Sequence, residues 1–68
     1  MANGSTAIQT KSLTIIEDQL QHEFLACRKA QEYALSFSNP DLKNLANTVA
    51  QHHRERFDRL FDYLNSHA

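Results

Sequence analysis

Two side chains, Glu23 and His53, are the residues of this sequence best suited to chemistry. Each falls in a pattern of apolar or small residues spaced three and four apart, which predicts that each points into a helical core. Carboxylate and imidazole groups that project into a helical bundle can bind iron and manganese. The same two groups can instead form a buried hydrogen-bonded pair that fixes helix register and helps to specify a partner. The sequence favours this pair over a bound iron, manganese or zinc ion.

Cys27 follows Glu23 by one helical turn and is the only cysteine of the chain. It could join a metal site or be oxidised, but a lone cysteine among apolar residues is more often a small hydrophobic side chain. We find no Ser/His/Asp set, no glycine-rich phosphate loop and no CxxC motif. We therefore expect a protein that is not an enzyme and that needs no cofactor.

The element that brings these residues together is the break at Phe37-Ser38-Asn39-Pro40-Asp41. Pro40 lacks a backbone N–H and disfavours helical geometry at the preceding residue, so a first helix must end by Asn39. Asn39 is a good N-cap and proline suits the first position of a new helix. The short connection predicts an antiparallel helical hairpin with a first helix over about 13–36, a turn over 37–39 and a second helix over about 40–66.

The 3-4 spacing on the two sides of the turn predicts which residues face each other. Residues at equal distance from the turn should meet, which places Glu23 opposite His53. The predicted pairs are Ala34/Leu42, Ala30/Ala46, Cys27/Val49, Glu23/His53, Leu20/Arg56, Ile16/Leu60 and Leu13/Tyr63. Phe57 and Leu64 are expected beside Arg56 and Tyr63. Only the layer of Glu23 and His53 is wholly polar.

The ends of the first helix and the charges of the second helix give further expectations. Residues 1–11 are small, polar and aperiodic, which predicts a mobile N-terminal tail ahead of a hairpin over 12–68. Ser12 and Thr14 compete as the helix cap, with Thr14 and Glu17 at capping-box spacing. In the second helix, Arg54–Asp58 and Glu55–Arg59 have the spacing of favourable ion pairs on a solvated surface.

The length of 68 residues predicts one small domain, and two helices alone leave much apolar surface uncovered. We therefore expect a homodimer in which two hairpins form a four-helix bundle. A net charge of −1 with mixed signs argues against a nucleic-acid surface, and no segment is apolar enough to suggest a membrane span. An unpaired cysteine suggests an intracellular location.

Several segments resemble a known family. They are Leu13-Thr14-Ile15-Ile16-Glu17-Asp18-Gln19-Leu20, then Glu23, Asn39-Pro40-Asp41-Leu42-Lys43 and Ala50-Gln51-His52-His53. They resemble short spore coat proteins of endospore-forming Firmicutes, similar to the coat protein F group and to a half-length ferritin-like hairpin. The resemblance covers about residues 13–65 and implies a ferritin-like bundle, a place in the spore coat and other coat proteins as partners. In ferritin-like proteins the second helix carries A-x-x-E-x-x-H, whereas this chain has Ala50, His53 and Arg56 at that spacing. The Glu is replaced by His and the His by Arg, which argues against di-metal oxidase activity.

These observations lead to three functional hypotheses. The first is a non-enzymatic, self-associating structural protein, with the spore coat as the location that the resemblance implies. The second is a degenerate metal-binding bundle that uses Glu23 and His53, with Cys27 as a weaker ligand. The third is a helical adaptor that recruits another protein through a broad apolar face.

Overall fold

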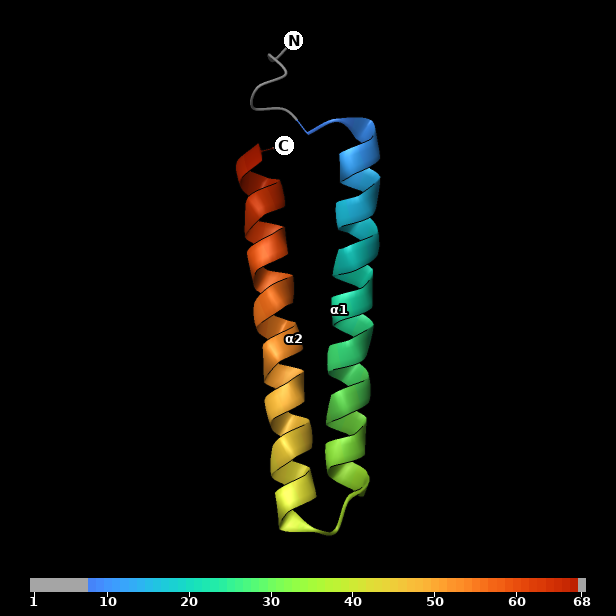
Figure 1. Cartoon of the computed structure of the whole chain (residues 1–68), viewed down its shortest axis with the longest axis vertical. Helices are drawn as coiled ribbons and strands as arrows, with labels where there is room; N and C mark the ends of the chain where they lie inside the picture. The colour runs from blue at the N-terminus through green and yellow to red at the C-terminus, as the bar shows by residue number, and fades with distance from the viewer. Residues whose placement is uncertain (1–7, 68) are drawn as a thin grey trace.

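The computed structural model describes residues 8–67, which form two long antiparallel helices joined by a short turn (Figure 1). Helix α1 runs over Thr10–Ser36 and helix α2 over Pro40–His67. This all-α helical hairpin confirms the predicted fold of the single chain. Most of the predicted N-terminal tail, residues 1–7, lies outside the described residues.

Helix α1 begins three residues before the predicted position 13, and neither predicted cap is used. The N-cap position is Gln9, whose carbonyl accepts a hydrogen bond from the Leu13 N–H at 2.8 Å. Thr14 lies inside the helix, where its hydroxyl donates to the Thr10 carbonyl at 3.1 Å. Because that hydroxyl is satisfied by the preceding turn of helix, the Thr14–Glu17 capping box does not form.

The turn has the predicted cap at the start of α2. The side-chain oxygen of Asn39 accepts hydrogen bonds from the N–H groups of Asp41 at 2.8 Å and Leu42 at 3.2 Å. At the end of α1, the ammonium group of Lys43 donates to the Ala34 carbonyl at 2.8 Å. Lys43 thus satisfies one of the carbonyls that every helix end leaves without a partner, and it ties the second helix to the first.

The inward side of α1 was predicted correctly, whereas α2 is rotated relative to the prediction. The inward residues of α1 are Leu13, Ile16, Leu20, Glu23, Cys27, Ala30 and Ala34. The inward residues of α2 are Lys43, Ala46, Ala50, His53, Phe57, Leu60, Leu64 and His67. Leu42, Val49, Arg56 and Tyr63 were predicted in the seam but lie exposed beside it. Two contacts go with this orientation of α2. Lys43 donates a hydrogen bond to the end of α1, and the ring centres of Phe57 and Phe24 lie 6.3 Å apart.

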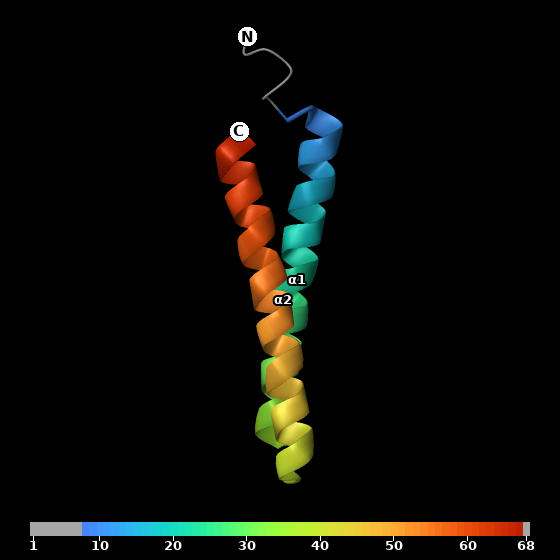
Figure 2. The same cartoon turned by 60° about the vertical axis from the view of Figure 1, so that its left-hand side comes forward.

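The core of the hairpin is made of small side chains. Among the described residues, the buried apolar side chains are Cys27, Ala30, Ala34, Ala46 and Ala50. The two helices lie at a shallow angle and form a body whose Cα atoms extend 54 × 15 × 10 Å (Figure 2). Such a narrow pair of helices has no second layer to cover its larger apolar side chains.

Candidate functional site

The midpoint of the hairpin contains a buried carboxylate with three polar neighbours. Glu23 is 4% exposed, the least exposed residue of the described chain. One carboxylate oxygen, Oε1, lies 2.5 Å from His53 Nδ1. The other, Oε2, accepts from the Gln19 amide at 2.9 Å and from Arg56 Nε at 3.3 Å. We call these four residues the Glu23 cluster.

The positions of the four residues follow from helical geometry. Gln19 precedes Glu23 by four residues, so the two share one side of α1. Arg56 follows His53 by three residues, so both reach Glu23 from one side of α2. The predicted pairing of Glu23 with His53 is confirmed by their hydrogen bond.

The hydrogen bond between Glu23 and His53 fixes the position of a proton. A carboxylate only accepts hydrogen bonds, so His53 Nδ1 must carry the hydrogen and donate it to Glu23. Arg56 Nη2 lies 3.1 Å from the same nitrogen. Because Nδ1 carries a hydrogen, it cannot also accept from Arg56, and the guanidinium group is held by Glu23 instead.

The pKa of Glu23 is lowered from its ordinary value of 4.5. The hydrogen bond from His53 is the largest cause. Burial acts in the opposite direction, and the hydrogen bonds from Gln19 and Arg56 and the charge of Arg56 add to the lowering. Glu23 is therefore held as a carboxylate, which makes it a poor general acid at neutral pH.

The geometry bears on whether the cluster could hold a metal. Glu23 and His53 supply two donor groups, but both oxygens of Glu23 already accept hydrogen bonds. The positive guanidinium of Arg56 also lies against the carboxylate, where it opposes a second cation. Within residues 8–67, no group of three or more His, Cys, Asp or Glu side chains is placed to hold a metal ion.

Cys27, the weaker predicted ligand, lies in the small-residue core. It is a buried free thiol that clusters with Ala30 and Ala50. These neighbours offer no polar side chain, so the environment of Cys27 is that of a small hydrophobic residue. Cys27 and Glu23 both border one surface pocket, but the Glu23 carboxylate is bound by His53, Gln19 and Arg56.

The sequence did not reveal the roles of Gln19 and Arg56. Arg56 was placed in a layer with Leu20, although its long side chain reaches Glu23. The spacing could have indicated both contacts, because Gln19 lies one turn before Glu23 and Arg56 lies one turn after His53. Arg56 also falls at the spacing where the A-x-x-E-x-x-H pattern has histidine, so this chain has a cation where that pattern has a metal ligand.

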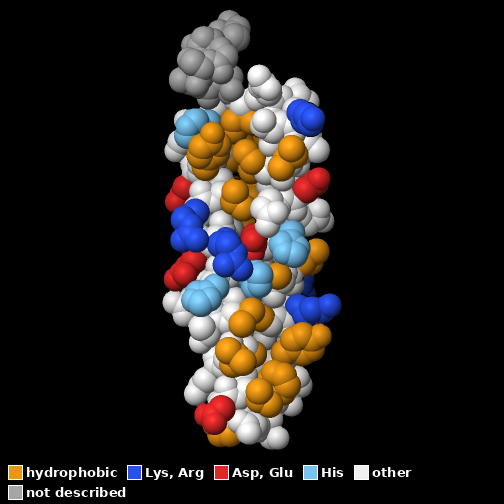
Figure 3. Space-filling model, in the orientation of Figure 1, with side chains coloured by type: hydrophobic (Ala, Val, Ile, Leu, Met, Phe, Trp, Pro, Cys, Tyr) orange, Lys and Arg blue, Asp and Glu red, His pale blue; other side chains and the backbone are white. Residues whose placement is uncertain are grey.

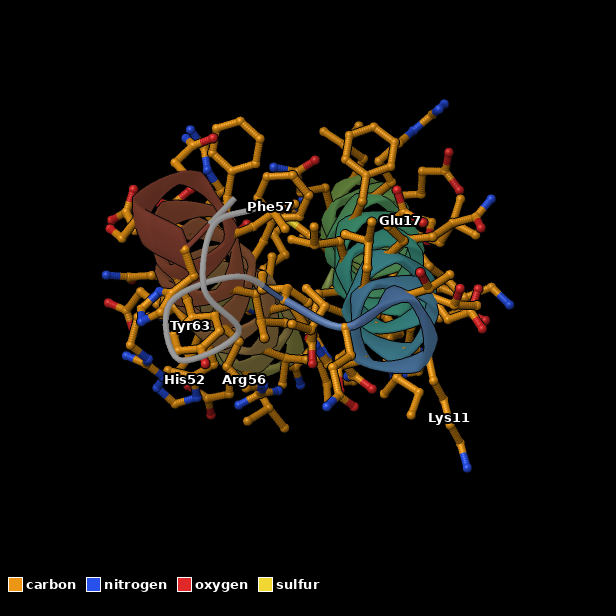
Figure 4. All side chains as sticks on the ribbon, turned by 90° about the horizontal axis from the view of Figure 1, so that it is seen from above. Lys11, Glu17, His52, Arg56, Phe57 and Tyr63 are labelled. Carbon is orange, nitrogen blue, oxygen red and sulfur yellow. The ribbon has the colours of Figure 1, made fainter. Side chains whose placement is uncertain are left out.

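The two sides of the hairpin differ in chemistry. Figure 4 shows His52, Arg56 and Tyr63 on one side of α2 and Phe57 on the other. His22 belongs to the first side, since it lies one turn after Gln19, which borders the same pocket as Arg56 and Tyr63. We call this side the histidine face, and Figure 3 shows its histidine and arginine groups across the middle with apolar groups above and below.

Comparison with protein families, with curated proteins and with solved structures gave no match. Of the helices in the described chain, neither combines the length and the apolar content that a membrane crossing requires. The function is therefore inferred from the side chains of the hairpin themselves.

Proposed function

We propose that this chain is a non-enzymatic structural protein that associates with a second copy of itself, so that two hairpins form a ferritin-like four-helix bundle. One observation carries the proposal: within residues 8–67, the only apolar side chains that the hairpin buries are small. Ten large apolar side chains of the described residues remain exposed, from Val49 at 39% to Leu35 at 83%. A second pair of helices would cover a face of this surface, and burial contributes roughly 25 cal/mol for each Å².

The histidine face is the side that fits a second hairpin. Residues seven apart share one side of a helix. Two such series in α2 include residues that Figure 4 labels on the histidine face: Leu42, Val49, Arg56 and Tyr63, and Leu45 and His52. From α1, Ile15 and Tyr33 join it, because they lie seven residues before and eleven residues after His22, which is close to two and three helical turns. The exposed large apolar residues of this face are Ile15, Tyr33, Leu42, Leu45, Val49 and Tyr63. Of the described residues, the other exposed large apolar side chains are Phe24, Leu25, Leu35 and Phe61.

The arrangement of the histidine face suits a two-fold axis through its middle. Glu23 is the central residue of Thr10–Ser36, and His53 lies next to the centre of Pro40–His67. An axis at this level would place the apolar residues near the turn of one copy, such as Leu45, against those near the open end of the other, such as Tyr63. The two polar middles would meet at the axis. Each Arg56 is already paired with Glu23, so this contact does not require two unpaired guanidinium groups to approach.

The Glu23 cluster then has a structural role. A buried ion pair adds little net stability, but a misaligned helix would leave its carboxylate without a partner. The cluster therefore favours one register of α1 against α2. This role requires only the contacts of a single hairpin and no bound metal.

The resemblance to short spore coat proteins supports an assembly role, because a coat protein acts by associating with copies of itself and with other coat proteins. The metal-binding hypothesis finds less support, since Arg56 neutralises the carboxylate that a metal would need. The adaptor hypothesis uses the same histidine face with another protein as the partner, and the oligomeric state distinguishes it from self-association.

Sedimentation equilibrium of the full chain tests the proposal. We expect a dimer, and we expect Leu45→Glu to weaken association at least tenfold, because it places a charge in the apolar part of the interface. Leu35→Glu is the matched control: Leu35 is the most exposed large apolar residue and lies on the opposite side, seven residues after Arg28. A wild-type monomer at millimolar concentration, or equal effects of the two variants, would contradict the proposal.

A further inference from the structure

A pocket on the side opposite the histidine face has features of a ligand site. It has a volume of about 360 Å³ and lies between α1 and α2. Its apolar wall includes Phe24 and Phe57, whose ring centres are 6.3 Å apart, and Cys27 borders it. The Phe57 ring stacks in turn on Phe61 at 6.0 Å. Flat, apolar molecules bind well to such aromatic surfaces.

The charges around this pocket leave one cation without a partner. Arg54 pairs with Asp58 at 3.4 Å, and both border the pocket. Glu23 also borders it, but its carboxylate is bound by His53 and Arg56. Arg28 forms no salt bridge within residues 8–67, so its guanidinium group is the one full charge at the pocket that is not balanced.

We propose that this pocket binds an aromatic molecule that carries a single negative charge. The rings of the ligand lie against Phe24 and Phe57, and its acidic group pairs with Arg28. A guanidinium group is suited to carboxylate and sulfonate groups because its N–H donors can bind two oxygens at once. The ligand site does not depend on self-association, because Phe24, Phe57 and Arg28 belong to one hairpin and lie on the side opposite the histidine face.

Fluorescence titration of the full chain with 1-anilinonaphthalene-8-sulfonate tests this site. The neutral compound N-phenyl-1-naphthylamine has the same rings without the sulfonate and serves as the ligand control. We expect saturable binding of one sulfonate per chain, roughly tenfold tighter than the neutral compound, which corresponds to one charge-assisted hydrogen-bonded contact. Saturation also distinguishes a formed pocket from diffuse binding to exposed apolar surface.

Matched arginine variants test the role of the charge. Arg28→Gln should weaken the sulfonate about tenfold and leave the neutral compound unchanged, whereas Arg59→Gln, on the histidine face, should alter neither. Binding of the sulfonate should also slow the reaction of Cys27 with a thiol reagent, because the thiol borders the pocket. Absence of saturable binding, or an equal response of both variants, would overturn the site. Sedimentation of the same samples reports self-association separately, so failure of one proposal is distinguishable from failure of the other.

Discussion

The half of the hairpin near the turn and the half near the chain ends are held together differently. Near the turn, the buried core residues are Ala30, Ala34 and Ala50. Their small side chains let the backbones of the two helices approach closely. Near the chain ends, larger residues such as Ile16, Leu60 and Leu64 remain partly exposed. The helices therefore pack closely through small side chains in the turn half, whereas the large apolar side chains of the open half are not fully buried. The turn half supplies the close contact between the helices, and the open half fills the seam with larger side chains that stay partly exposed.

The Glu23 cluster lies at the border of these halves, and removing its carboxylate should have the largest effect. Glu23→Ala leaves His53 and Arg56 without their acceptor. We expect a loss of about 3 kcal/mol in unfolding free energy, at the low end for a broken buried pair because Arg56 is half exposed. Urea denaturation at fixed protein concentration measures it, since self-association would add a concentration dependence.

The exposed residue Glu17 provides the control for this variant. Glu17→Ala should change the unfolding free energy by less than about 0.5 kcal/mol. If Glu23→Ala were as mild as Glu17→Ala, the cluster would have no role in aligning the helices. Glu23→Gln should fall between them, because an amide can still accept one hydrogen bond from His53 or Arg56.

Lowering the pH should remove part of the unfolding free energy that the Glu23 carboxylate contributes, without a mutation. The pKa of Glu23 in the folded chain is lowered, so the unfolded chain binds more protons in this range and stability rises with pH. The contribution should be fully present above the ordinary value of 4.5 and should disappear as the pH falls through the lower folded value. Unfolding free energies measured across this range should show a slope that is reduced in Glu23→Gln. An unchanged slope in that variant would assign the acid sensitivity to other carboxylates.

The sequence was sufficient to predict the hairpin, its turn and the pairing of Glu23 with His53, because each depends on local geometry and on distance from Pro40. It was insufficient to predict the rotation of α2. The pattern with Leu42 in the seam is more apolar than the observed pattern with Lys43, but the Lys43 ammonium group caps the end of α1. The contact of Arg56 with Glu23 was missed for a related reason: a long side chain reaches beyond the layer in which its Cα lies.

Enlarging a residue in the turn half should separate the two kinds of packing. Ala30 is buried against Cys27 and Ala50, so Ala30→Leu should push the helices apart and lower the unfolding free energy by about 1–3 kcal/mol. Ala26→Leu is the matched control, because Ala26 is only partly buried. It should be neutral within about 0.5 kcal/mol. Equal tolerance of both leucines in thermal or urea unfolding would mean that the turn half is not closely packed.

The smallest effect should come from the cap of α2, where the turn half begins. Asn39→Ala removes the acceptor for the N–H groups of Asp41 and Leu42, and N-cap losses of this kind cost about 1 kcal/mol. Asn39→Asp keeps an acceptor at the same position and should retain most of the stability. Ser38→Ala, one residue earlier in the exposed turn, should have no measurable effect in urea unfolding. If Asn39→Asp lowered stability as much as Asn39→Ala, the Asn39 amide would act through a contact other than the N-cap hydrogen bonds. If Ser38→Ala matched Asn39→Ala, the loss would reflect a general property of the turn and not the hydrogen bonds that begin α2.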